Sequence, residues 1–123
     1  MKKLIILTTF IFVTNLFSQT LECRLTSNMK VGMYVDVYDN KMIDPSKNIY
    51  NKISTNEGIH IFKGYDAKHK KYFIWMIKSS GNVNGISTFQ AMIIDENNND
   101  NKTQLVCYDA KQVNQYRQNK IEE

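Results

Sequence analysis

Hydrophobic and polar residues alternate along much of this chain. Between residues 21 and 37 the odd positions are mostly apolar, whereas even positions include charged residues such as Glu22 and Asp36. A period of two indicates a β-strand with one face buried and the other in water. Because so long a strand usually bends or breaks, we expect an interruption at residues 26–28 or at Gly32.

A later segment is apolar at every position. Residues 72–77 read Tyr-Phe-Ile-Trp-Met-Ile, which predicts a central strand covered on both faces. Phe73 and Trp75 would share one face with the apolar positions of the first strand. The dipeptide Asn84-Gly85, or Gly81-Asn82 before it, tolerates positive φ and predicts a hairpin turn. Further strands are expected at residues 59–63, 89–95 and 103–108.

Two segments have weaker patterns. Pro45 forbids a central strand and Asp44-Pro45-Ser46 could open a helical turn, so we expect residues 42–58 to form mixed loop. After a β domain at residues 19–109, the tail at residues 110–123 has Val113, Tyr116 and Ile121 near helical spacing. This spacing predicts a short amphipathic helix docked on the sheet. The alternative is a frayed end.

The first eighteen residues have the build of a secretory signal peptide. Lys2 and Lys3 precede an apolar run at residues 4–13, and a short polar segment follows to Ser18. This run is shorter than the roughly 20 residues of a transmembrane helix. We therefore expect cleavage after Ser18, a secreted or periplasmic protein, and no integral membrane segment after cleavage. Lipidation of Cys23 would need a small residue just before the cysteine, and the charged Glu22 at that position disfavours it.

The chain has two cysteines, Cys23 and Cys107. In an exported protein two such cysteines are expected to form a disulfide, here one that closes nearly the whole domain. The sequence therefore predicts a mainly β fold, either a small antiparallel β-sandwich or a β-barrel. We expect six to eight strands by the usual spacing, with one disulfide and a short C-terminal helix.

This layout resembles, in outline, that of the small exported inhibitors of lysozyme, which are disulfide-tied barrels. Those inhibitors carry a Ser-Gly-x-x-Tyr loop. This chain has Ser80-Gly81-Asn82-Val83-Asn84, with asparagine in the place of the tyrosine.

Charge and motifs argue against several classes of function. Without Lys2 and Lys3 the net charge of +4 falls to +2, which is too low for a typical nucleic-acid-binding domain. The segment at residues 95–101 resembles a calcium loop, but Asp100 replaces its glycine and Val106 its final glutamate. We therefore expect a solvated hairpin loop there.

The histidines and serines suggest neither a metal site nor a catalytic one. His60 and His69 have no partners at metal-like spacing, and His60 is expected on the wet face of its strand. Serines lack a Gly-x-Ser-x-Gly turn, and no spacing links a nucleophile to either histidine. We expect no metal, no cofactor and no catalytic activity.

Aromatic and basic residues are the best candidates for binding. Tyr34 and Tyr38 stand at even, polar positions of the first long strand, and exposed tyrosines are typical of recognition surfaces. A basic segment at residues 68–71, flanked by Tyr65 and Tyr72, suits an anionic partner. The candidate binding residues are therefore Tyr34, Tyr38, Tyr65, Lys68, Lys70 and Lys71.

The sequence thus predicts a small exported non-catalytic binding protein, either a protein-binding or an inhibitor module. Its partner, a protein or a small ligand, would be met outside the cytoplasm. One alternative is a lipocalin-like carrier with a hollow interior lined by Met29, Met33, Phe73 and Trp75. The other is a small secreted enzyme with a cleft of converging polar groups.

Overall fold

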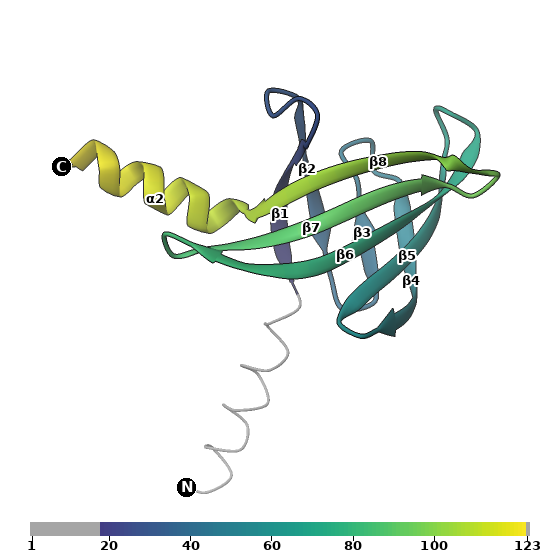
Figure 1. Ribbon diagram of the computed structural model, residues 1–123, viewed down its shortest axis with the longest axis horizontal. Coiled ribbons are helices and arrows are strands. Elements are labelled where there is room, and N and C mark those ends of the chain that lie inside the picture. Colours follow the sequence, from purple (N-terminus) through teal and green to yellow (C-terminus); the bar gives the residue numbers. More distant parts are fainter. Residues whose placement is uncertain (1–17, 123) are drawn as a thin grey trace, which may run out of the picture.

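Eight antiparallel strands follow one another around a closed barrel in the order of the sequence (Figure 1). The computed structural model describes residues 18–122, so all of the expected signal segment except Ser18 lies outside the described residues. The strands are β1 (Gln19–Leu25), β2 (Gly32–Val37), β3 (Lys41–Ile43), β4 (Ile49–Asn56), β5 (Ile59–Asp66), β6 (Lys71–Val83), β7 (Ile86–Asp95) and β8 (Asn98–Asp109). Of the two predicted architectures, the barrel is confirmed.

The alternating pattern between residues 21 and 37 correctly predicted which side chains of β1 and β2 face the core. Leu21 and Cys23 on β1 and Val35 on β2 point into the barrel and are buried. The expected interruption is found at residues 26–31, where the chain turns from β1 into β2. The polar turn allows one alternating segment to form two paired strands, with Cys23 opposite Met33.

The prediction of mixed loop for residues 42–58 is wrong. This segment contains most of β3 and all of β4, and Met42 and Tyr50 are buried in the core. Pro45 lies in the connecting loop, where the ladder needs no N–H donor. The pattern was obscured because Ile49 and Ile53 on β4 point outward and are exposed.

Trp75 on β6 lies at the centre of the core, as predicted. It is 2% exposed, and its ring meets that of Tyr50 edge-on with centroids 6.2 Å apart. Phe73 shares this face and packs against the core. The opposite face of β6 is not fully covered, because Tyr72 is 48% exposed. The expectation of two buried faces therefore holds for the inner one only.

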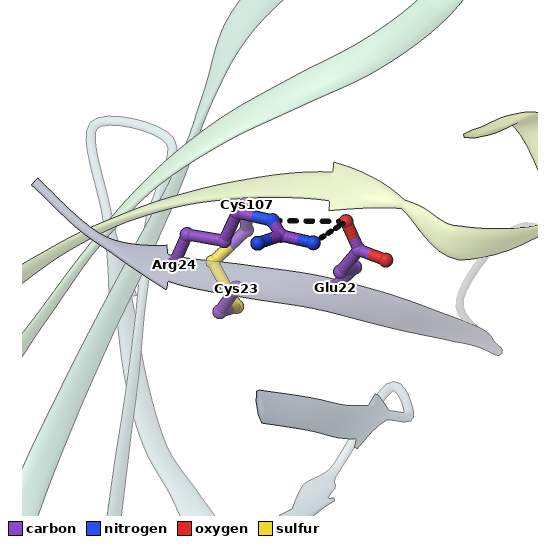
Figure 2. Close-up of a disulfide and its surroundings, with 4 residues drawn as sticks. All are labelled: Glu22, Cys23, Arg24 and Cys107. Carbon is purple, nitrogen blue, oxygen red and sulfur yellow. Dashed lines mark hydrogen bonds and ion pairs between the residues drawn. A yellow bond between two sulfur atoms is a disulfide. The ribbon is translucent and has the colours of Figure 1, made fainter. Parts of the chain in front are cut away.

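The predicted disulfide joins Cys23 to Cys107 at the β1–β8 seam, where the last strand closes on the first (Figure 2). The two residues stand directly opposite each other, with Cα atoms 4.0 Å apart and both side chains fully buried. The covalent bond thus lies at the one strand pair that joins the two ends of the barrel sequence.

The predicted C-terminal helix is α2 (Ala110–Glu122), which follows β8 directly and extends away from the barrel (Figure 1). The Asp109 carboxylate caps it by accepting a hydrogen bond of 2.9 Å from the N–H of Gln112. Ala110 and Val113 are buried, whereas Ile121 is 79% exposed. The helix therefore docks through its first turns. Among residues 18–122, no helix is long and apolar enough to cross a membrane.

The two ends of the barrel differ. The end that carries α2 also carries the β2–β3, β4–β5 and β6–β7 turns, and we call it the helix end. The opposite end, with the β5–β6 and β7–β8 turns, is the loop end. The predicted Asn84-Gly85 turn lies at the helix end between β6 and β7, with φ angles of 55° and 83°.

Candidate functional site

The basic segment forms the β5–β6 turn at the loop end of the barrel. The Asp66 carboxylate organises it by accepting hydrogen bonds from the N–H groups of Lys68 (2.9 Å) and His69 (3.0 Å). Burial of this carboxyl acts to raise its pKa, but the hydrogen bonds and the nearby His69 ring outweigh burial and lower the pKa. The Lys68 and Lys70 side chains are exposed on a turn of defined shape.

Two tyrosines accompany this turn on the outer face of the barrel. Tyr65 and Tyr72 stand opposite each other on β5 and β6, with ring centroids 5.1 Å apart, and both are about half exposed. The Lys63 ammonium lies 5.6 Å from the Tyr72 ring centroid and pairs with Glu96. This cluster combines exposed aromatic surface with a turn that carries positive charge.

The Lys71 side chain is exposed, but its charge is paired with a carboxylate, which differs from the predicted role as a free binding cation. Its ammonium lies 3.0 Å from a carboxylate oxygen of Asp95, which is buried. The hydrogen bond from Lys71, together with one from the Asn97 N–H, lowers the pKa of Asp95. Lys71 therefore neutralises a buried carboxylate at the end of β7.

The other two predicted tyrosines lie elsewhere. Tyr34 donates a hydrogen bond of 3.0 Å to the carboxylate of Glu22, whereas Tyr38 follows β2 at the helix end, with Lys41 over its ring. The six predicted binding residues thus belong to separate regions of the barrel surface. Tyr65, Lys68 and Lys70 are brought together, and Tyr38 lies at the opposite end.

Sequence reasoning missed the surroundings of Glu22, which is only 5% exposed although it points away from the barrel interior. Figure 2 shows Arg24 approaching its carboxylate beside the disulfide, and the closest guanidinium contacts are 3.2 Å. Arg117 of α2 reaches the same carboxylate at 3.9 Å. This ion cluster is structural, because it joins the helix to the seam.

A groove with a volume of about 560 Å³ lies on the outer face of β6, β7 and β8. Cross-strand pairing places Met76 opposite Met92, and Val106 opposite Gln90. Their neighbours Trp75 and Leu105 point inward, so these side chains point outward. The apolar lining of the groove comes from Ile59, Met76, Val83, Met92 and Val106, and its exposed polar rim from Lys78, Gln90 and Gln104.

A firmly held hairpin limits the groove at the helix end. Val83, at the tip of β6, is 57% exposed. Behind the tip, a bulge at Ser80 is held by a 3.1 Å hydrogen bond from the Ser80 hydroxyl to that of Thr88. The Ser87 N–H donates a 2.7 Å hydrogen bond to Gln112 of α2. The stretch compared above with the loop of lysozyme inhibitors is therefore this bulge and hairpin tip.

His60 lies on the other face of β5 from the one predicted. It stands opposite Ile77, which points into the core, so its ring faces the barrel interior. There it lines a cavity of about 110 Å³ at the helix end together with Lys52. Burial and, next, the positive charge of Lys52 lower the pKa of His60. The prediction assumed that the flanking Ile59 and Ile61 face the core, but β5 alternates in the opposite sense. Ile59 and Ile61 pair with the outward-facing Lys78 and Met76, and Ile59 lines the outer groove.

The residues expected to line a hollow carrier interior are arranged differently. Met29 lies in the β1–β2 loop and is exposed. Met33, Phe73 and Trp75 pack in or against the core cluster, which fills the middle of the barrel. The cavity at the helix end is much smaller than the roughly 300 Å³ minimum of pockets for drug-sized ligands.

The asparagine-rich segment forms a solvated hairpin connection between β7 and β8, as predicted, with residues 97–102 exposed. The turn is shorter than the expected loop, because β8 begins at Asn98. The Asp95 carboxylate accepts hydrogen bonds from the N–H of Asn97 and from the ammonium of Lys71. Within residues 18–122, no group of three or more His, Cys, Asp or Glu side chains is placed to hold a metal ion.

Comparison with known protein families, with curated proteins and with solved structures found no match to this chain.

Proposed function

We propose that this protein is an exported, non-catalytic module that binds another protein through the groove on the outer face of β6, β7 and β8. The observation that carries the proposal is the combination of a filled barrel core with an open apolar groove on the outside. A small ligand is normally enclosed by its site, whereas a partner protein covers a surface of this kind from one side.

Export is supported from two directions. The N-terminal pattern of Lys2 and Lys3 before a short apolar run is typical of a signal peptide. Independently, the Cys23–Cys107 disulfide is of a kind that persists in oxidising compartments and is rare in the cytosol. A partner would then be met in the periplasm or outside the cell.

The chemistry of the groove indicates what the partner presents. Met76 and Met92 offer flexible thioether side chains that adapt to apolar groups of different shapes. The exposed amides of Gln90 and Gln104 can donate and accept hydrogen bonds at the rim, and Lys78 is the cation of the groove lining. A partner segment with apolar side chains and a carboxylate beside them would satisfy all three features.

The hairpin supports recognition by a preformed surface. The bulge at Ser80 and the link from Ser87 to α2 hold the exposed Val83 tip in one position. A surface that is already ordered loses less conformational entropy on binding. The hairpin and groove together therefore form a continuous binding face.

The test is site-specific photo-crosslinking in the cells that produce the protein. A photoreactive residue replaces Met92 in the groove or, as the matched control, Ile53, which is exposed on β4 on the other side of the barrel. We expect a defined protein adduct from position 92 and none from position 53.

The adduct from position 92 should disappear when Val106→Asp places an unpaired charge in the groove. An adduct from position 53 and none from position 92 would overturn the proposal. So would an adduct from position 92 that survives Val106→Asp in a folded protein.

A further inference from the structure

The barrel is not filled to its helix end, where a cavity smaller than the groove is lined by residues of β1, β2, β4, β5, β6 and β7. Its floor is made by the buried side chains of Leu21, Phe62 and Ile77. Lys52 and His60 supply nitrogen-containing groups to the same cavity. The site is thus an apolar hollow with basic groups among its lining residues.

The strand register explains why basic side chains face inward here. Lys52 stands opposite Phe62 on the β4–β5 ladder, and His60 stands opposite Ile77 on the β5–β6 ladder. Phe62 and Ile77 belong to the core, so their partners share the inner face. The Lys52 ammonium lies 5.9 Å from the centroid of the Phe62 ring.

The charge of this cavity is positive. The residues lining it include Lys52 and His60, and none of those lining residues is acidic. Lys52 takes part in none of the ion pairs found between residues 18 and 122. A half-buried ammonium beside apolar side chains favours an anion that also carries apolar surface.

We propose that the helix end of the barrel binds a small carboxylate with a short apolar tail, the carboxylate pairing with Lys52 and the tail resting on Phe62 and Ile77. The size of the cavity limits the ligand. A cavity of about 150 Å³ holds a benzene molecule, and the present one is about 110 Å³. This site is separate from the outer groove, and its proposal does not depend on a protein partner.

His60 supplies a built-in reporter. The ionisable groups that act on it are Lys52 on β4 and Asp39 after β2, and Tyr38 lines the same cavity. A bound carboxylate adds a negative charge nearby, which favours the charged imidazolium and raises the pKa of His60.

The test uses butyrate as the probe, with butanol as the uncharged control of the same chain length. Calorimetric titration of the purified protein should show that butyrate binds and that butanol binds more weakly. In NMR titrations, butyrate should raise the pKa of His60 and butanol should leave it unchanged. Equal binding of the two probes, or a His60 pKa that butyrate does not move, would overturn the proposal.

The variant Lys52→Met keeps most of the side-chain length and removes the charge. It should weaken butyrate binding at least about tenfold, as expected for loss of a charge-assisted hydrogen bond. Lys63→Met, on the outer face of β5, is the matched control and should bind butyrate like the unaltered protein. A folded Lys52→Met protein with unchanged affinity would refute the assignment. If that variant does not fold, the His60 titration of the unaltered protein decides.

Discussion

Gly64 on β5 shows how single residues determine the packing of the core. It stands opposite Tyr50, whose ring packs against Trp75. A Cβ atom at this position would lie 2.4 Å from the carbonyl oxygen of Ile49 and 2.8 Å from two carbon atoms of Tyr50. Only glycine lets β4 and the Tyr50 ring come this close.

We expect Gly64→Ala to lower the free energy of unfolding by about 1–3 kcal/mol, the usual range for overpacking a core. The closest clash is with a backbone oxygen, which cannot move aside as a flexible side chain can. Ser54→Ala, at an exposed position of β4, is the control and should stay within about 0.5 kcal/mol. Urea unfolding of both variants measures the difference, and equal midpoints would contradict the packing described.

Trp75→Ala should lower the free energy of unfolding by about 3–5 kcal/mol, because it removes buried apolar surface and leaves a cavity. Trp75 is the single tryptophan, so its burial also predicts blue-shifted fluorescence that a soluble quencher barely reduces. Met76→Ala, the adjacent residue on the outer face, should destabilise the barrel much less. Strong quenching, or a Trp75→Ala protein of unchanged stability, would place Trp75 in solvent.

Alternation of apolar and polar residues predicted the strands whose apolar side chains point into the barrel. It missed a strand whose apolar side chains point outward. It indicated β1 and β2 correctly, whereas the β6–β7 turn was predicted from residues that tolerate positive φ and lies at Asn84-Gly85, the first of the two predicted positions. It failed on β4, where Ile53 points outward and Lys52 inward around a bulge. The groove could not be predicted, because Met76, Met92 and Val106 meet only through the pairing of three strands.

Substitutions in the turn between β6 and β7 test the backbone conformation of this hairpin. Gly85 has a φ of +83°, and a Cβ atom there would meet nothing within 4 Å, so any penalty for a side chain comes from the backbone conformation alone. Gly85→Ala should lower the free energy of unfolding by about 1–2 kcal/mol. Asn84→Gly is the control and should be close to neutral, because glycine also adopts the φ of 55° found there. Thermal unfolding compares the two, and an unaffected Gly85→Ala protein would be inconsistent with this turn.

For the whole molecule, the β1–β8 seam determines whether the sheet is closed. The disulfide spans a sequence separation of 84 residues and joins the outermost pair of strands. In the chain-entropy model a loop of this length stabilises the folded state by about 4–5 kcal/mol, and native disulfides usually contribute about 2–5 kcal/mol. Glu22, Arg24 and Arg117 add an ion cluster beside it.

Replacing both cysteines by alanine should therefore lower the free energy of unfolding by about 2–5 kcal/mol, a large part of the stability of a small domain. Guanidinium unfolding of the double variant and of the unaltered protein measures this. Addition of a reductant should destabilise the unaltered protein and leave the double variant unchanged. A double variant as stable as the unaltered protein would mean that the non-covalent contacts of β1 and β8 are enough to close the seam.

We propose that the protein works outside the cytoplasm as a barrel whose seam is closed by a disulfide. Intact-mass spectrometry of the protein recovered from the extracytoplasmic fraction, after thiol alkylation with and without prior reduction, tests it most directly. We expect a chain that begins at Gln19 or a near neighbour, and that takes up alkylating reagent at two cysteines after reduction and at neither before. Recovery of the chain from Met1 in the cytoplasm, with both thiols free, would show that the protein is neither exported nor closed by a disulfide.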